Sequence, residues 1–345
     1  MSAGDPLTVS ADLRRVAAAF GLGTVTAARF LADGLMNDNW RVETDAGVFA
    51  VKKIRDVSLP TARRNLKVLG ELAAQRLPVP EPVQDARRSV VVEFGGAGYC
   101  VLPWMDGEHL AGSDLSTDQV VHLGVVLGQI HQALNQEAVM VELPALPASL
   151  PASVTDPARA LAEADRHLAV IRSRKEPLPC DAEVAGLLEE RKVLIREYAD
   201  ARSVAAETIA SFGWTHGDVR SSNLLWREGR VRGLLDWDRI RPRPFGEEVA
   251  HTATLMFSRA DGAMDLDKIA ALVTGYRSAL PIGVSELADA VDRLWWGRVS
   301  ALWQLVFHNS RADHSSDHLF AMGEALTVWW TEHRDQVQAA FAAGG

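Results

Sequence analysis

Alternating apolar and polar positions dominate the first hundred residues of the chain. Three short runs rich in β-branched and aromatic residues extend from Thr24 to Leu31, from Trp40 to Thr44 and from Val48 to Ile54. Two more, from Ser89 to Phe94 and from Tyr99 to Pro103, flank a glycine-rich turn. Alternate side chains of a strand point to opposite faces, so the pattern predicts a five-stranded antiparallel sheet.

Helical periodicity replaces this alternation over most of the remaining chain. Apolar residues three and four positions apart predict a short helix after Ser10 and a longer one from Thr61 to Arg76. Further helical patterns cover residues 116–135, 157–174, 181–211 and much of 245–341. The expected fold is therefore α+β and bilobal, with the sheet in residues 1–103 and a larger, mainly helical lobe in residues 104–345.

Composition narrows the class of partner. The 345 residues include 36 basic and 45 acidic side chains, a net charge of −9, which argues against nucleic acid and favours a neutral or cationic small-molecule substrate. Nowhere do about 18 apolar residues follow one another, so no membrane association is expected. Only two cysteines occur, Cys100 and Cys180, which indicates a reducing, cytoplasmic setting. The chain is expected to be a monomer or a homodimer.

The strongest chemical signal lies between the two main helical regions. His216-Gly217-Asp218-Val219-Arg220-Ser221-Ser222-Asn223 is followed, after a predicted hairpin, by Leu234-Leu235-Asp236. Phosphoryl transfer needs a carboxylate that orients the attacking hydroxyl and oxygen ligands that hold Mg²⁺ on the nucleotide phosphates. Asp218 is the candidate base, and Asn223 and Asp236 are the candidate metal ligands.

The predicted sheet offers further candidates for nucleotide binding. In the third strand Lys52 shares a face with Ala50, where it can contact phosphates. Taken alone, a lysine at such a position is more often a solvent-facing strand residue. The turn that contains Asn37, Asp38 and Asn39 can cover phosphates or be an ordinary hairpin turn. The segment Pro103-Trp104-Met105 marks the crossing between the lobes, where backbone groups can bind a purine base of ATP or GTP.

Substrate contacts are harder to predict. Asp238 is a carboxylate that could pair with an amine of the substrate. Trp296 and Trp303 could stack on a sugar or a nucleobase, although aromatic residues at helical spacing are more often part of a core.

Together, His216-Gly217-Asp218-Val219-Arg220-Ser221-Ser222-Asn223 and Leu234-Leu235-Asp236-Trp237-Asp238 resemble the motifs of the aminoglycoside phosphotransferase and choline kinase family. The resemblance implies a protein-kinase-like fold, with Asp218 as base, Asn223 and Asp236 on Mg²⁺, and Lys52 on the phosphates. It also implies that His216 is structural and that Glu248 belongs to the site.

The sequence departs from the kinase pattern in two places. Gly217 stands where protein kinases have arginine, which predicts activity that does not depend on a phosphorylated loop. The helix after Lys52 should supply a glutamate partner for that lysine, but the matching stretch contains Asn65; either Asn65 or Glu71 could replace it.

The predicted activity is transfer of the γ-phosphate of ATP or GTP to a hydroxyl of a small molecule. An antibiotic of the aminoglycoside or nucleoside type is the favoured acceptor, which would make the chain a resistance enzyme. Choline, homoserine or a sugar is the metabolic alternative. A catalytically inactive nucleotide-binding regulator is the reading from another class.

Overall fold

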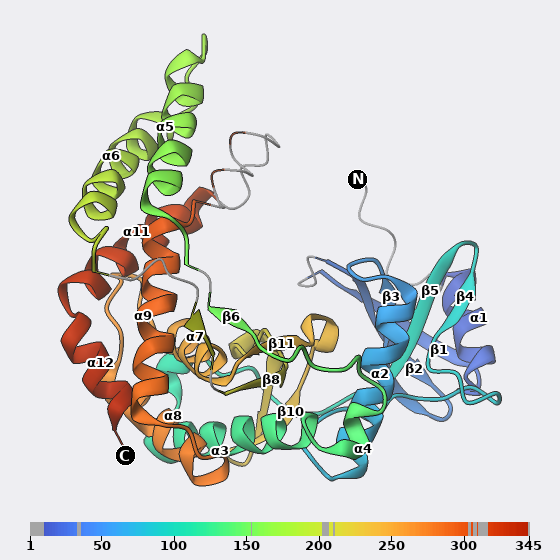
Figure 1. Ribbon diagram of the computed structural model, residues 1–345. Helices are drawn as coiled ribbons and strands as arrows, with labels where there is room; N and C mark the ends of the chain where they lie inside the picture. Colours follow the sequence, from blue (N-terminus) through green and yellow to red (C-terminus); the bar gives the residue numbers. More distant parts are fainter. Residues whose placement is uncertain are drawn as a thin grey trace. The chain divides into compact units, whose positions relative to one another are not determined.

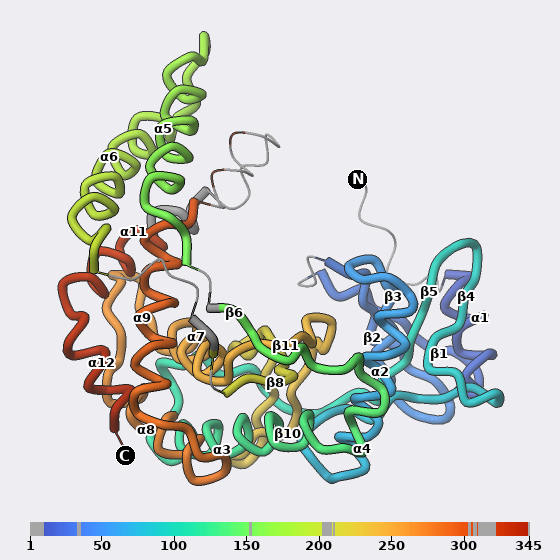
Figure 2. The backbone as a smooth tube through the Cα atoms, viewed as in Figure 1, coloured from blue at the N-terminus to red at the C-terminus, as the bar shows by residue number. Residues whose placement is uncertain are grey.

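The computed structural model describes residues 10–32, 36–152, 154–201, 207–209, 211–302, 305, 309 and 317–343 (Figures 1 and 2). The chain forms two compact units. The first unit consists of Met1–Ala111, Val126–Leu146 and Gly213–Pro242, and the second of Gly112–Val125, Pro147–Phe212 and Arg243–Gly345.

The first unit contains the predicted sheet. Its strands are β1 (Val25–Leu31), β2 (Asp38–Thr44), β3 (Gly47–Ile54), β4 (Val92–Phe94) and β5 (Ala97–Pro103), in the order β1-β2-β3-β5-β4. All neighbours are antiparallel, which confirms the prediction. β4 is shorter than predicted, because Ser89 is held in a turn by the Asp85 carboxylate, 2.7 Å from its amide nitrogen.

The two faces of the sheet differ in character. Helix α1 (Ala11–Ala19) covers one face with a core that includes Val16, Val51 and Val101. Lys52 lies on the opposite face, directly across from Cys100 of β5. The predicted alternation in β3 is therefore correct.

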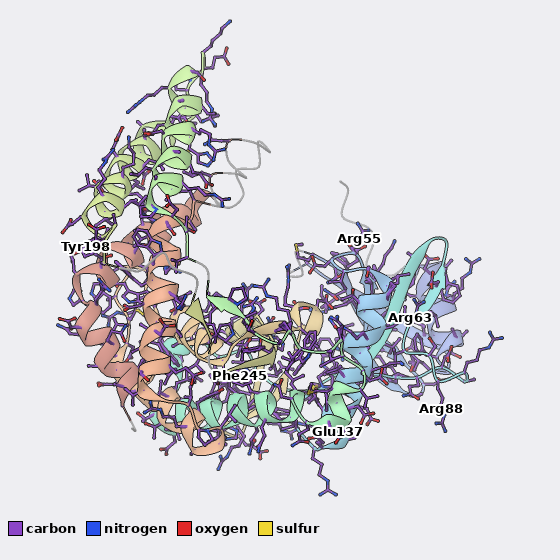
Figure 3. All side chains as sticks on the ribbon, in the orientation of Figure 1. Arg55, Arg63, Arg88, Glu137, Tyr198 and Phe245 are labelled. Carbon is purple, nitrogen blue, oxygen red and sulfur yellow. The ribbon has the colours of Figure 1, made fainter. Side chains whose placement is uncertain are left out.

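Helix α2 (Leu59–Ala74) begins at Ser58, whose hydroxyl accepts a hydrogen bond from the Thr61 amide, 3.3 Å away. Its buried stripe consists of Ala62, Asn65, Leu66, Val68, Leu69 and Leu72. One asparagine thus occupies a position that helical periodicity assigns to the core. On the outer side, Arg63 pairs with Glu93 of β4 (Figure 3).

Short strands and turns complete the first unit. β9 (Leu224–Arg227) and β10 (Arg230–Leu234) form the predicted hairpin, whose two turn residues, Glu228 and Gly229, both have positive φ. Around it lie β8 (Phe212–Thr215), β11 (Arg241–Pro244), α4 (Glu137–Met140) and part of α3 (Thr117–Leu134). The Asn135 side chain joins the end of α3 to β8, where it bonds both backbone groups of Trp214.

The second unit is mainly helical. Its elements are α5 (Pro157–Ser173), α6 (Asp181–Glu197), α7 (Phe245–Phe257), α8 (Leu266–Ala279), α9 (Val284–Ser300), α11 (Asp317–Glu332), α12 (Arg334–Ala342) and the short strands β6 (Pro151–Ala152) and β7 (Glu207–Thr208). The helix predicted to reach residue 211 ends at Glu197, and that part of the prediction is wrong. Tyr198 follows and packs edge-on against Trp295, 5.5 Å between ring centroids (Figure 3).

A buried ion pair connects helices of the second unit. The Arg191 guanidinium on α6 binds the carboxylate of Glu324 on α11 and donates to the Val299 carbonyl, 3.0 Å away. Such a pair is stable in an apolar interior only when its hydrogen bonds are satisfied. Among the residues that the structure describes, no helix is long and apolar enough to cross a membrane.

Candidate active site

His216 joins the two halves of the motif. Its Nε2 donates to the Leu235 carbonyl oxygen, 3.0 Å away, and its Nδ1 accepts from the Asp218 amide at 3.2 Å. This pair of bonds fixes the tautomer with the proton on Nε2. The ring also packs edge-on against Trp237, 4.6 Å between centroids. The imidazole therefore holds the loop before Asn223 against the segment that carries Asp236.

Gly217 has a backbone conformation that other residues rarely adopt. Its φ is +90°, and a Cβ at this position would lie 2.6 Å from the Arg239 carbonyl oxygen. A side chain would therefore force the two loops apart. The positive φ and this close approach together account for glycine at position 217.

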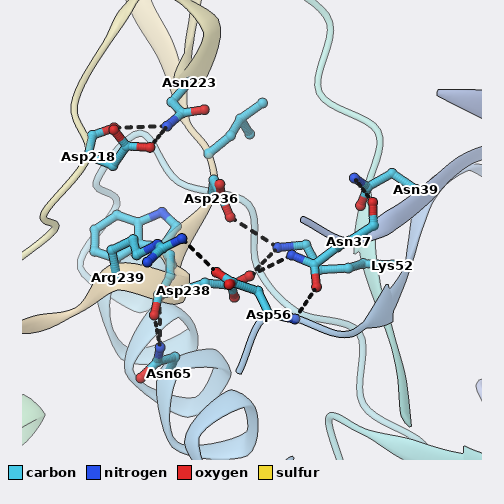
Figure 4. A network of polar contacts seen from close by, with 12 residues as sticks. Asn37, Asn39, Lys52, Asp56, Asn65, Asp218, Asn223, Asp236, Asp238 and Arg239 are labelled. Carbon is cyan, nitrogen blue, oxygen red and sulfur yellow. Dashed lines mark hydrogen bonds and ion pairs between the residues drawn. The ribbon is translucent and has the colours of Figure 1, made fainter. Parts of the chain in front are cut away.

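Asp218 and Asn223 face each other across a short loop (Figure 4). The Asn223 amide nitrogen donates to the Asp218 backbone oxygen at 2.8 Å and to its carboxylate at 3.2 Å. With the nitrogen directed at Asp218, the Asn223 carbonyl oxygen points away and can serve as a ligand. Arg220 Nε lies 4.0 Å from the same carboxylate. Sequence reasoning gave Arg220 no role, although it stands inside the motif.

Lys52 reaches the second motif segment. Its Nζ lies 3.2 Å from Asp236 Oδ1 and 3.0 Å from Asp238 Oδ2 (Figure 4). The Asp236 side chain is 44% exposed, whereas that of Asp238 is 13% exposed. Asp236 also has φ +61°, a left-handed conformation that aspartate tolerates better than most residues. The structure thus places Asp238, predicted as a substrate contact, beside Lys52.

Electrostatics keep Lys52 charged. Burial alone would lower the pKa of Lys52, but the carboxylates of Asp238 and Asp236 outweigh it and raise this pKa above its ordinary value. Across the strand, burial raises the pKa of the Cys100 thiol to about 12, although the Lys52 charge opposes this shift. The site therefore contains a permanent cation and an un-ionised thiol at neutral pH.

Asn37 ties the turn before β2 to this cluster. Its Nδ2 donates to Asp238 Oδ2 at 2.9 Å, and its Oδ1 accepts from the amides of Arg55 at 2.8 Å and Asp56 at 3.2 Å. Asn39 lies directly across the sheet from Lys52, on the same face. Residues 33–35 of the predicted phosphate-covering turn lie outside the described residues.

Asn65 of α2, which the sequence suggested only as a possible partner of Lys52, bonds the segment around Asp238 instead. Its Nδ2 donates to the carbonyl oxygens of Trp237, 2.9 Å away, and Asp238, 3.3 Å away. Glu71, the other candidate partner, is exposed. The available signal was a polar residue within the apolar stripe of a helix, since buried polar groups need partners.

The segment Pro103-Trp104-Met105 leaves β5 as an ordered connection. The Trp104 amide donates to the Val48 carbonyl oxygen, 3.0 Å away, and the Arg41 guanidinium lies 5.3 Å from the centre of the Trp104 ring. Pro103 has no N–H and the Trp104 amide is bonded to Val48, so the Met105 amide is the next backbone donor along the segment.

Comparison with known proteins decides the family. Residues 27–282, well over half of the chain, match the sequence profile of APH, the phosphotransferase enzyme family. The chain belongs to this family. It is a small-molecule phosphotransferase, as the motifs predicted, and the inactive-regulator reading is set aside.

Curated relatives of this phosphotransferase include homoserine kinases. Homoserine kinase of Pseudomonas aeruginosa is 25% identical over 317 residues, 87% of this chain and 89% of the relative. Homoserine kinase of Methylobacterium radiotolerans is 22% identical over 284 residues, 81% of this chain and 79% of the relative. Both are distant in sequence, yet each spans most of both chains.

Solved structures confirm the predicted kinase-like fold. A spectinomycin phosphotransferase in complex with ADP and spectinomycin matches with a TM-score of 0.69 at 13% identity, over 96% of this chain and 99% of that chain. A choline kinase from Cryptosporidium parvum matches with a TM-score of 0.55 at 12% identity, over 90% of each chain.

The oxygen atoms of the phosphotransferase site suit a hard cation. Within the described ranges no three His, Cys, Asp or Glu side chains converge as a metal cage. Mg²⁺ on a nucleotide does not require one, because phosphate and water oxygens supply most of its ligands. The Asp236 carboxylate and the Asn223 carbonyl oxygen are donors of the right kind and number.

The remaining predicted substrate contacts lie in the second unit. Glu248, on α7, is fully buried. Trp296, on α9, is 1% exposed and donates its indole N–H to the Thr155 carbonyl oxygen, 2.8 Å away, as a core residue does. Trp303 lies outside the described residues. Neither Glu248 nor Trp296 has the exposure expected of a substrate contact.

Carboxylates do gather elsewhere in the second unit. A hollow of about 380 Å³ is lined by Leu187, Glu190, Asp261, Glu324, Ala325, Val328, Trp329 and Glu332. One of its four carboxylates, Glu324, is already paired with Arg191.

Proposed function

We propose that this phosphotransferase moves the γ-phosphate of Mg²⁺-bound ATP or GTP to a hydroxyl of a small amino alcohol. The observation that carries the proposal is the position of four groups within one unit: Asp218 bonded to Asn223, and Lys52 bonded to Asp236. These groups supply a base, two metal ligands and a phosphate contact, which is the set that phosphoryl transfer requires.

In this scheme Asp218 orients the acceptor hydroxyl and takes its proton as the oxygen attacks the γ-phosphorus. The bond from that phosphorus to the bridging oxygen breaks, and ADP or GDP leaves. The Asn223 amide holds the carboxylate in place. Asp236 and the Asn223 carbonyl oxygen would hold Mg²⁺, which would supply positive charge next to the phosphates. The Lys52 ammonium contacts the phosphates, and Arg220 adds a fixed positive charge near Asp218.

The purine base is expected at the segment from Pro103 to Met105. The Trp104 amide is occupied by Val48, so we expect the base to accept from the Met105 amide. The Met105 side chain lies against Gly233, where a Cβ would come within 2.8 Å of its sulfur. This packing holds the segment close to the β9–β10 hairpin.

The names of the relatives support an amino alcohol as acceptor. Homoserine and spectinomycin, the molecules named for the kinases above, both contain a hydroxyl and a basic nitrogen. The net charge of −9 favours a substrate of this kind over an anionic one. The curated relatives favour homoserine, and the structural neighbour of higher TM-score favours an antibiotic, so both are arms of one test.

The test is a nucleotide-consumption screen of the purified chain with Mg²⁺ and ATP or GTP. Its arms are homoserine, choline, spectinomycin, aminoglycosides, amino sugars, nucleoside antibiotics and neutral sugars without nitrogen. Product formation confirmed by mass spectrometry in one amino-alcohol arm, and its absence with Asp218→Asn, supports the proposal. Turnover with sugars or nucleosides that lack a basic nitrogen, and with none of the others, would contradict it.

A further inference from the structure

The counter-charge of Lys52 comes from an unexpected element. In the kinase pattern a helix glutamate pairs with this lysine. Here the Lys52 Nζ is bound instead by Asp236 and Asp238, which follow shortly after the β9–β10 hairpin. Asp238 is the more buried of the two and also accepts from Asn37. The lysine is therefore held by the same segment that carries the proposed metal ligand.

Asn65 fixes that segment from the helix side. It is 2% exposed, and its amide nitrogen donates to two successive carbonyl oxygens, those of Trp237 and Asp238. Its own carbonyl oxygen accepts from Arg64 Nε at 3.0 Å and from Arg64 Nη2 at 2.8 Å. These bonds exclude the alternative orientation of the Asn65 amide. With its nitrogen and oxygen exchanged, the nitrogen would face the Arg64 guanidinium and the oxygen would face the two carbonyl oxygens.

The Arg64 guanidinium is itself held, 5.5 Å from the centre of the Trp214 ring. The segment from Trp237 to Asp238 is thus fixed by its backbone through Asn65 and by its side chain through Lys52 and Asn37. Asp236, immediately before it, pairs with Lys52, and its side chain is more exposed than that of Asp238.

We propose that Asn65 is a positioning residue of the phosphotransferase: it holds the 236–238 segment so that Asp238 retains Lys52 while Asp236 stays available to the metal-bound nucleotide. This inference rests on the proposed function. A neutral amide suits this position better than the glutamate of the kinase pattern, because the groups that face α2 are carbonyl oxygens, which need a hydrogen-bond donor. A carboxylate at position 65 would lack that donor and would face two partial negative charges.

The test measures how much Mg²⁺ tightens nucleotide binding. Calorimetric dissociation constants for ADP and GDP, with and without Mg²⁺, are compared between the wild type, Asn65→Asp and Asn65→Glu. Both variants should retain Mg²⁺-free binding within about threefold, and lose at least about tenfold of the Mg²⁺-induced tightening, equal to about 1.4 kcal/mol. Asn65→Gln, which keeps the amide, should lose less than either.

Asn135→Asp is the matched control. Asn135 also donates to two carbonyl oxygens, those of His131 at 2.8 Å and Trp214 at 3.0 Å, but it does not bond the 236–238 segment. It should lower the melting temperature and leave the Mg²⁺-induced tightening at the wild-type value. If Asn65→Asp does not fold, the same dissociation constants are measured for Asn65→Ser. The serine hydroxyl is too short to bridge both carbonyl oxygens.

The outcomes separate the inference from the function on which it rests. Wild-type protein that binds neither nucleotide, or binds without a Mg²⁺ effect, would overturn the proposed function and the inference with it. Wild-type tightening that persists in Asn65→Asp or Asn65→Glu would overturn the positioning role alone, even if both variants melted at lower temperature.

Discussion

At the level of single residues, the site depends on aspartates held in different ways. Asp218 is oriented by the amide of Asn223, Asp238 is bound by Lys52 and Asn37, and Asp236 keeps the greater exposure. These environments suit three tasks: orienting a hydroxyl, holding a lysine and binding a metal. One residue type can serve all three because its surroundings, not its chemistry, differ.

The left-handed backbone of Asp236 gives the first prediction. A backbone φ of +61° destabilises a non-glycine residue by about 1 kcal/mol, and glycine adopts this conformation without that strain. Asp236→Gly should therefore change the free energy of unfolding by less than about 1 kcal/mol, because relief of strain offsets the lost Lys52 contact. Denaturant titration measures this stability. Phosphate transfer and Mg²⁺-induced tightening should both be lost, and full activity would contradict the assignment of the metal ligand.

Asp238 governs the charge of Lys52 and gives the second prediction. The raised pKa of Lys52 means that its ion pairs stabilise the fold below the ordinary lysine value, and that this contribution disappears only as the pH rises through the higher folded-state value. Asp238→Asn removes the stronger carboxylate, so it should cost about 1–2 kcal/mol at pH 7. It should also move the alkaline limit of the pH–rate profile to lower pH. An alkaline limit identical to that of the wild type would contradict the role of Asp238.

At the level of elements, the close contact of two loops gives the third prediction. Gly217→Ala places a Cβ 2.6 Å from the Arg239 carbonyl oxygen at φ +90°. The variant should lose about 1–3 kcal/mol of stability and at least tenfold in kcat, with a smaller change in nucleotide KM. The matched control is Gly186→Ala, in α6, where a Cβ meets nothing within 4 Å. A Gly217→Ala enzyme with wild-type kcat would show that the loop approach is not needed.

The sheet gives the fourth prediction, on cysteine reactivity. Burial raises the pKa of the Cys100 thiol to about 12, so at pH 8 this residue is almost entirely the unreactive thiol. A thiol reagent should label the half-buried Cys180 first and Cys100 only on unfolding. The neutral thiol is favoured in the fold, so stability from this group falls as the pH rises through the folded-state value. Rapid labelling of Cys100 in the native protein, located by peptide mapping, would contradict its burial.

The elements also show what the sequence could predict. Alternation in β3 located Lys52 on the correct face, and the spacing of Asp218, Asn223 and Asp236 found the groups that the first unit brings together. Asn65, considered in the sequence only as a possible partner of Lys52, lies in the buried stripe of α2. Its partners could not be predicted, because they are backbone carbonyls more than 170 positions away along the chain. Local patterns define faces of an element, and only the folded chain defines what meets them.

The substrate contacts predicted on α7 and α9 are a glutamate and a tryptophan. Trp296 and Glu248 are both buried, although their residue types suit a substrate site. A tryptophan at helical spacing and a glutamate in a helix have the same sequence pattern whether they line a pocket or fill a core. The predicted helix extended too far beyond Glu197 for a related reason: the sequence after Glu197 continues with residues that favour helices.

For the molecule as a whole, the candidate catalytic residues lie in one compact unit. Every contact among Lys52, Asn65, Asp218, Asn223, Asp236 and Asp238 lies within the unit that also holds the sheet. Family membership and the two motifs agree on phosphoryl transfer to a small molecule. The relatives differ in the acceptor that each is named for, which is consistent with a conserved transfer chemistry and a variable acceptor.

The most direct test follows the phosphoryl group itself. Wild-type protein and Asp218→Asn are incubated with γ-labelled nucleotide, Mg²⁺ and the acceptor found in the screen, and labelled product is counted. The variant keeps the size of the side chain and an oxygen that can accept from Asn223, so nucleotide binding should remain within about threefold, while transfer falls by about 10²–10⁴. Transfer at the wild-type rate by Asp218→Asn would contradict the central claim that this carboxylate is the base.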